Sequence, residues 1–184
     1  MVISYLGKGG FRLQSGETVL LVDPGETRQR ADLVLRTQAP ADISEAPTDE
    51  VIFPGEYEKA GIEVQGFPLE SSTKAVTTGY LVIWEEMRFA ILGAIGAAPD
   101  ASVLKQIAEP DIIIVPADND KYLTYDAARK LIHQLEPSIA IISLYKNANE
   151  AAKSLGEKTE IQEKLVFKKK DLVERQGRVV VLKE

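Results

Sequence analysis

The sequence predicts an α/β sandwich with helices on its outer faces. The first half is a series of short apolar runs separated by glycines and prolines, without helical periodicity, which is typical of strands. The second half alternates amphipathic periods with short continuous apolar runs, which is the pattern of helices that alternate with buried strands. Strands first and strand-helix alternation second favour this fold class.

In the first half, the expected strands are bounded by turn-forming residues. Glu85 and Glu86 predict a hairpin turn between the last two of them. Residues 37–49 are rich in alanine, proline, aspartate, serine and threonine and lack an apolar period, so a loop is expected there. The strands are expected at residues 2–6, 11–13, 19–22, 33–35, 62–67, 80–84 and 88–92.

In the second half, Pro99 suits the first position of a helix at residues 99–108. Thr124 can cap a second helix, which Pro137 ends. The apolar side of this second helix is formed by Ala127, Ala128, Leu131, Ile132 and Leu135. A short helix is expected at 149–155, strands buried on both faces at 112–115 and 139–142, and closing strands at 166–167 and 179–182. The basic triplet 168–170 is interpreted as a solvated strand end.

The composition is typical of one globular domain over residues 1–184, with 45% hydrophobic residues. The 22 basic and 28 acidic residues give a net charge of −6, which disfavours non-specific binding to nucleic acid or to an anionic membrane. No apolar run approaches the roughly 18 residues of a membrane helix, and residues 1–8 lack the pattern of a secretory signal. We therefore expect a cytoplasmic protein, and without cysteine it has neither disulfides nor thiolate sites.

Several segments match the motifs of one hydrolase family. Residues 2–13 read VISYLGKGGFRL, residues 19–24 read VLLVDP, and residues 31–37 read ADLVLRT. Residues 54–58, PGEYE, and 110–116, PDIIIVP, continue the match. Together these segments resemble the metallo-β-lactamase-fold hydrolases, in particular the small bacterial zinc-dependent hydrolase-like branch, over roughly residues 2–155. The resemblance implies a metallo-β-lactamase-like αββα sandwich, with two mixed β-sheets and helices on the outer faces.

The same resemblance implies metal ligands at positions where this chain has other residues. In such hydrolases the loop after Thr37 typically reads His-x-His-x-Asp-His, because ligands on one tight loop can reach two adjacent metals. Here residues 38–43 read QAPADI. Of the implied ligands only Asp42 is retained, while Pro40 and Ile43 carry no side-chain donor atom.

The other implied ligand positions are also replaced. Gly93 is followed by Ala94 instead of a metal-bridging aspartate, and Leu144 precedes Tyr145 where the family has its final histidine. Lys8 replaces the histidine beside the site. A further histidine would fall near Glu70 or Ser71.

The chain has a single histidine, whereas a catalytic zinc centre needs about three nitrogen, sulfur or oxygen ligands. His133 lies opposite the apolar side of its helix and is expected to face solvent. Oxygens from Asp42, Glu70 and Asp23 would fall short of the roughly six to eight that calcium takes. We therefore expect no catalytic residue, no metal and no cofactor.

Two further motifs favour turns over binding sites. Lys8-Gly9-Gly10 lacks the spacing of a phosphate loop and is interpreted as a hairpin turn. The stretch 118–120, DND, begins like a calcium loop but lacks its glycine and its final glutamate, so it is interpreted as a polar turn bordering the cleft. No serine lies in a nucleophile elbow.

The preferred hypothesis is a non-catalytic member of the family, a pseudoenzyme that acts as a binding or scaffolding protein for an unknown protein or small-molecule partner. Asp23 would cap its own turn. The former ligand positions would pack as a plug formed by Gln38, Pro40, Ile43, Ala94 and Leu144.

Two alternatives remain open. One is a metal-dependent hydrolase of an ester, amide or phosphodiester with a rearranged site. The other is a small-molecule binding module that reuses the old cleft. The latter predicts an open pocket beside Lys8 and Gln38, whereas a scaffold predicts a filled pocket and an exposed apolar patch elsewhere. The residues expected to remain around the cleft are Lys8, Asp23, Gln38 and Asp42.

Overall fold

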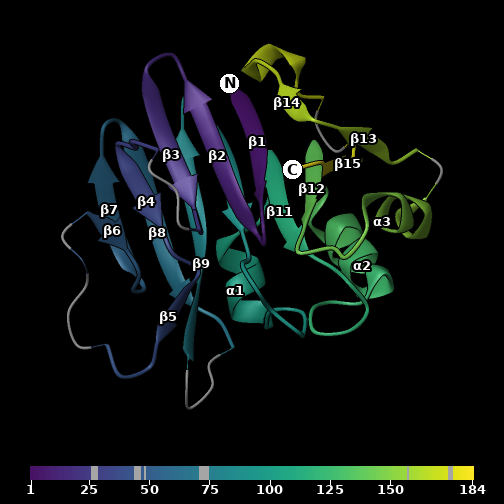
Figure 1. Cartoon of the computed structure of the whole chain (residues 1–184), viewed down its shortest axis with the longest axis horizontal. Helices are drawn as coiled ribbons and strands as arrows, with labels where there is room; N and C mark the ends of the chain where they lie inside the picture. Colours follow the sequence, from purple (N-terminus) through teal and green to yellow (C-terminus); the bar gives the residue numbers. More distant parts are fainter. Residues whose placement is uncertain (26–28, 44–46, 48, 71–74, 157, 174–175) are drawn as a thin grey trace.

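The computed structural model describes residues 1–25, 29–43, 47, 49–70, 75–156, 158–173 and 176–184, in which two β-sheets pack against each other (Figure 1). The first sheet has six strands. Their order across the sheet is β14 (Lys164–Val166), β1 (Val2–Gly7), β2 (Gly10–Ser15), β3 (Thr18–Val22), β4 (Leu33–Leu35) and β6 (Glu50–Val51). Strands β3, β4 and β6 are parallel, and the other neighbours are antiparallel.

The second sheet has nine strands and is also mixed. Its order is β13 (Glu160–Gln162), β15 (Arg178–Leu182), β12 (Ile139–Ser143), β11 (Ile112–Pro116), β10 (Met87–Ile91), β9 (Ala75–Trp84), β8 (Ile62–Pro68) and β7 (Gly55–Lys59), with β5 (Gln38–Pro40) paired to β9. The pairs from β13 to β10 are parallel and those from β10 to β7 antiparallel. The predicted fold class, with two mixed sheets and flanking helices, is confirmed.

The α-helices of the described residues lie on the nine-stranded sheet (Figure 1). They are α1 (Ala101–Gln106), α2 (Tyr125–Leu135) and α3 (Ala148–Leu155), and a short 3₁₀ helix follows at Lys169–Asp171. Thr124 caps α2 as predicted, accepting a hydrogen bond from the amide of Ala127. The prediction for Pro99 was wrong: Asp100 is the cap of α1, because its carboxylate accepts bonds from the amides of Ser102 and Val103.

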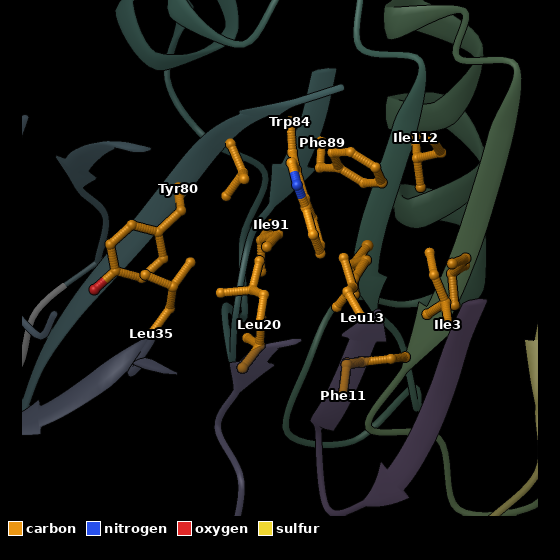
Figure 2. Packing of buried hydrophobic residues seen from close by; sticks show 14 of the residues in the cluster. Ile3, Phe11, Leu13, Leu20, Leu35, Tyr80, Trp84, Phe89, Ile91 and Ile112 are labelled. Carbon is orange, nitrogen blue, oxygen red and sulfur yellow. The ribbon is translucent and has the colours of Figure 1, made fainter. Parts of the chain in front are cut away.

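The main core lies between the two sheets (Figure 2). The six-stranded sheet contributes buried side chains such as Ile3 and Leu20, and the nine-stranded sheet contributes Tyr80, Phe89 and Ile112. A second core fills the space between the nine-stranded sheet and the helices. Strands β11 and β12 are therefore buried at every residue, as predicted from their continuous apolar sequences.

Four short strands were not predicted, namely β5, β6, β7 and β13. Strand β5 lies inside the expected loop and contains Pro40, β7 carries the exposed Glu56 and Glu58, and β13 has only three residues. Each is held by backbone pairing to a neighbour that is distant in sequence or by a hairpin. The predicted hairpin turn is confirmed, since Glu85 and Glu86 both have the positive φ angles of a type I′ turn, 51° and 61°.

Within the described residues, no helix has the length and apolar character needed to cross a bilayer. The triplet 168–170 is exposed but does not end a strand, since Lys169 and Lys170 lie in the 3₁₀ helix. Lys169 is paired with Glu86 at 2.6 Å.

Candidate functional site

A cavity of about 180 Å³ lies where five strands of the sandwich end. Strands β3, β4, β10, β11 and β12 all direct their carboxyl ends toward it, and the hairpin turn between β1 and β2 borders it. The carboxyl ends of parallel strands are where α/β folds usually place their sites. The side chains and backbone around the cavity come from Lys8, Gly9, Phe11, Val22, Asp23, Thr37, Gln38, Ile91, Gly93, Ala94, Ile114, Tyr122, Ser143 and Leu144.

The structure brings together three of the four residues expected around the cleft. Lys8, Asp23 and Gln38 line the cavity. Asp42 does not line it and is exposed. Gln38 begins β5, which pairs with β9 from this point on, so the chain is carried along that strand before it reaches Asp42.

The predicted plug forms only in part. Ala94 and Leu144 line the cavity together with Gln38, but Pro40 and Ile43 do not. Pro40 lies in β5 and Ile43 comes after it, so the chain carries both residues away from the strand ends. They therefore do not fill the cavity. The expectation of a completely packed plug was therefore wrong, and an open cavity lies beside Lys8 and Gln38.

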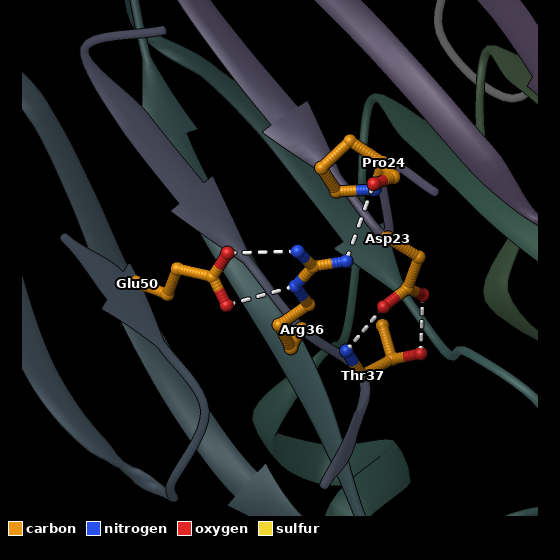
Figure 3. Close-up of polar contacts among 5 residues, drawn as sticks. All are labelled: Asp23, Pro24, Arg36, Thr37 and Glu50. Carbon is orange, nitrogen blue, oxygen red and sulfur yellow. Dashed lines mark hydrogen bonds and ion pairs between the residues drawn. The ribbon is translucent and has the colours of Figure 1, made fainter. Parts of the chain in front are cut away.

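Asp23 joins the ends of β3 and β4 (Figure 3). Its carboxylate accepts hydrogen bonds from the Thr37 amide at 2.8 Å and from the Thr37 hydroxyl at 2.5 Å, while its own amide donates to the carbonyl of Leu35. Burial raises the pKa of Asp23, against the opposing effect of the Thr37 hydrogen bonds and of the nearby Arg36 charge. The expectation that Asp23 caps its own turn is thus corrected, because its donors belong to the neighbouring strand end.

Arg36 fixes the same region from the other side. Its guanidinium binds both carboxylate oxygens of Glu50, at 2.7 and 2.9 Å, and donates to the carbonyl of Pro24 at 3.3 Å (Figure 3). The bond to Arg36 lowers the pKa of Glu50. Below them, the hydroxyl of Tyr80 lies 2.7 Å from the carbonyl oxygen of Arg36. This network holds the Asp23-Pro24 turn against β4 and β6.

Two glycines are needed for the close contacts around the cavity. Gly93 has a φ angle of +62°, and a Cβ atom there would lie 2.5 Å from the Cβ of Thr37. Gly9 has a φ angle of +86°, and a Cβ atom there would lie 2.8 Å from the side chain of Leu144. The contact with the Thr37 Cβ excludes a larger residue at Gly93, whereas at Gly9 the end of the Leu144 side chain would have to shift and the positive φ angle favours glycine.

Four polar side chains around the cavity are open, in the sense that no other described residue bonds to them. Those of Lys8, Gln38, Tyr122 and Ser143 make no hydrogen bond or ion pair with any other described residue. Ser143 is only 2% exposed. Because every fully buried side-chain oxygen in the described part of the chain has a partner, the Ser143 hydroxyl must open onto the cavity.

The acidic turn beside the cavity is satisfied by its own backbone. Asp118 is buried and one of its carboxylate oxygens accepts bonds from the amides of Asp120, Lys121 and Tyr122, at 2.9, 3.0 and 2.9 Å. Burial alone would raise its pKa, but these amides and the Lys146 charge hold the pKa below the ordinary value. The prediction of a polar turn is confirmed. The loop contributes Tyr122 to the cavity, not a carboxylate.

The remaining candidates lie elsewhere. His133 is exposed, as predicted, and borders a hollow of about 690 Å³ between α2, α3 and β15 that shares no lining residue with the cavity in the described part of the chain. Glu70 borders a third hollow near α1 and accepts a bond from the amide of Gly96 at 3.4 Å. Ser71 lies outside the described residues.

The residues around the cavity do not fit a metal centre of the kind that the resemblance implies. The single carboxylate, Asp23, is already bonded through both oxygens to Thr37, and Lys8 contributes a positive charge that opposes a cation. Across the described ranges, no group of three histidine, cysteine, aspartate or glutamate side chains is placed to hold a metal ion. Zinc sites take about three such ligands.

Thr37, Tyr122 and Ser143 were not predicted as site residues. A neutral hydroxyl at the end of a strand carries no sequence signal of its own. Only the position of Thr37 directly before the altered ligand loop, and of Ser143 directly before Leu144, could have suggested them.

The geometry agrees with comparisons to known proteins. The family model described as "Beta-lactamase superfamily domain" matches residues 2–142. Among curated proteins no sequence matches the chain.

Solved structures share the fold at low sequence identity. A Thermotoga maritima protein assigned to the Zn-dependent hydrolases of the metallo-β-lactamase superfamily superposes with a TM-score of 0.82 at 19% identity, covering 98% of this chain and 97% of its own. The metallo-β-lactamase fold protein YhfI of Bacillus subtilis gives 0.70 at 10%, covering 99% and 96%. At these identities the likeness establishes the fold alone.

Proposed function

This chain belongs to the beta-lactamase superfamily, and from that membership we propose that it is a non-catalytic member that binds a small molecule in the cavity at the strand ends. The observation that carries the proposal is the chemistry of the cavity. Among the described lining residues the only carboxylate, that of Asp23, is bonded to Thr37, while an ammonium group, an amide and two hydroxyls have no protein partner in that part of the chain.

The size of the cavity supports a small ligand. A volume of about 180 Å³ corresponds to roughly six water molecules at about 30 Å³ each, whereas pockets for drug-sized ligands measure about 300–1,000 Å³. A ligand of a few non-hydrogen atoms fits this space.

The scaffolding alternative has less support. It predicts a filled cleft and an exposed apolar patch, but the cleft is open, and the large apolar side chains exposed in the described residues are Val166 and Val173 only. Isolated apolar residues are normal on a protein surface. The open cavity is therefore the better candidate for the binding surface.

Metal analysis combined with an activity panel tests the proposal. Protein purified without chelators is analysed for transition metals and assayed on ester, amide and phosphodiester substrates, with and without added Zn²⁺ and Mn²⁺. We expect well below one metal ion per chain and no metal-stimulated hydrolysis. A stoichiometric metal with metal-dependent turnover would instead establish the hydrolase alternative.

A variant with restored ligands provides the positive control. The substitutions Gln38→His, Ala94→Asp and Leu144→His reintroduce the implied donors at the three replaced ligand positions that line the cavity. If this variant gains metal while the natural sequence does not, the difference lies in the side chains and not in the fold.

A further inference from the structure

The open side chains around the cavity have a definite charge. Among the described residues that line it, Lys8 is the one basic residue; its side chain is exposed, and its ammonium group has no carboxylate partner in that part of the chain. Asp23, the one acidic residue, directs both oxygens to Thr37. The open groups are thus one positive charge and three neutral groups that can donate hydrogen bonds, from Gln38, Tyr122 and Ser143.

From this arrangement we infer that the cavity binds a small organic monoanion, a short-chain carboxylate. The inference rests on the proposed function and names its ligand class. One unpaired ammonium group balances one negative charge, and hydroxyl and amide donors complete the hydrogen bonds that a carboxylate accepts.

Ser143 supports the assignment independently of Lys8. Its hydroxyl lies in a residue that is 2% exposed and opens onto the cavity without a protein partner. The hydroxyl is therefore placed to donate a hydrogen bond to a polar atom of a molecule bound in the cavity.

The rest of the lining defines the remainder of the ligand. Ile91, Ile114 and Leu144 form an apolar part of the wall, which suits a chain of a few carbons attached to the carboxylate. Inorganic phosphate fits less well. It is partly dianionic at neutral pH, it offers no apolar part, and its second charge would have no second cation among the described lining residues.

Titration with a matched set of small probes tests the inference. Propionate, its neutral analogue propionamide and inorganic phosphate are each titrated into the full chain at constant ionic strength, since salt screens an exposed charge. Binding is followed by chemical-shift changes in ¹H–¹⁵N spectra. We expect saturable shifts with propionate, at residues around the cavity, and weaker binding of both other probes.

Variants locate the site. Lys8→Met keeps the aliphatic stem and removes the charge, so propionate affinity should fall by about 10-fold or more, in line with a charge-assisted hydrogen bond. Affinity for propionamide should stay unchanged. Ser143→Ala should weaken propionate by roughly 2- to 10-fold, and Lys105→Met on α1, an exposed lysine outside the cavity, should have no effect. Thermal unfolding of each variant verifies that it is folded.

Several outcomes would overturn the inference. These are binding of propionamide or phosphate as tight as that of propionate, an unchanged propionate affinity in Lys8→Met, and the absence of detectable propionate binding. None of these results bears on metal content or hydrolysis, so the non-catalytic part of the proposed function is tested separately by the metal analysis.

Discussion

Two walls of the same cavity differ in how their polar groups are used. The bonded wall consists of Asp23, Thr37 and Gly93, and the open wall consists of Lys8, Tyr122 and Ser143. On the bonded wall the carboxylate and the hydroxyl satisfy each other at 2.5 Å, and the glycine lets Thr37 approach. On the open wall no side chain has a polar partner among the described residues.

The difference distinguishes polar groups that stabilise the fold from polar groups that are available to bind a ligand at the same site. A polar group that the protein satisfies internally contributes to stability and is not free to bind a ligand. A polar group left open beside a cavity contributes little to stability but is available for a ligand. Substitutions on the bonded wall should therefore change stability, and substitutions on the open wall should change binding.

The largest effect is expected from Gly93→Ala. The new Cβ atom would lie 2.5 Å from the Cβ and 2.6 Å from the hydroxyl oxygen of Thr37, in addition to the cost of a positive φ angle. We expect the free energy of unfolding to fall by about 2–4 kcal/mol, measured by urea denaturation with an unchanged m-value.

Gly16→Ala is the matched control for that substitution. Gly16 has a similar φ angle, +57°, but nothing lies within 4 Å of the position of its Cβ. Its loss should be limited to the backbone term of about 1–2 kcal/mol. Equal losses for the two variants would show that the contact with Thr37 is not what requires glycine on the bonded wall.

Thr37→Val is expected to have the next largest effect. The substitution preserves shape but removes the hydroxyl that donates to Asp23, leaving a partly buried carboxylate oxygen without that donor. The expected loss of stability is about 1–3 kcal/mol. Thr77→Val is the control, since Thr77 is buried and its hydroxyl makes no hydrogen bond within the described residues. A similar loss in both variants would show that the bond between the Thr37 hydroxyl and Asp23 does not contribute specifically to stability.

A change of pH is expected to have a smaller effect on stability. The Thr37 hydrogen bonds and the Arg36 charge lower the pKa of Asp23 and so offset part of the increase that burial causes. Its folded pKa is raised above 3.8, so the stability it contributes is complete below that pH and is lost as pH rises through the folded value. The folded pKa of Glu50 is lowered below 4.5, so its contribution is present above 4.5 and is lost as pH falls through the folded value.

These opposite signs can be measured by difference. The stability of the natural protein minus that of Asp23→Asn should decrease as pH rises from about 3.8 upward. The corresponding difference for Glu50→Gln should increase as pH rises toward about 4.5. Slopes of the same sign would mean that burial does not dominate at Asp23.

The sequence predicted the strands and helices whose apolar patterns are regular. The runs that form β11 and β12 and the apolar side of α2 were predicted because burial on both faces or on one side produces a recognisable period. Strands β5 and β7 were missed because their stability comes from pairing with β9 and β8, which is information that a local pattern does not contain.

The candidate site was predicted only in part, because some of its residues are positioned by long-range pairing. Lys8, Asp23 and Gln38 follow strands whose ends meet, so motif positions alone were sufficient to bring them together. Asp42 was placed at the site because the resemblance implies a metal ligand at its position, and only the pairing of β5 with β9 shows that the chain leaves the site between Gln38 and Asp42. Thr37 and Ser143 depend on long-range geometry that no spacing in the sequence indicates.

The smallest effect on stability is expected from Ser143→Ala, and this substitution distinguishes the two walls most clearly. Ser143 is as buried as Thr37, both being 2% exposed, so burial alone predicts similar costs for removing either hydroxyl. Since the Ser143 hydroxyl has no partner in the described residues, its removal should change the free energy of unfolding by less than about 0.5 kcal/mol. The same variant should bind propionate more weakly. A large loss of stability in Ser143→Ala would mean that its hydroxyl is already satisfied by the protein, and the open wall would then have no buried group reserved for a ligand.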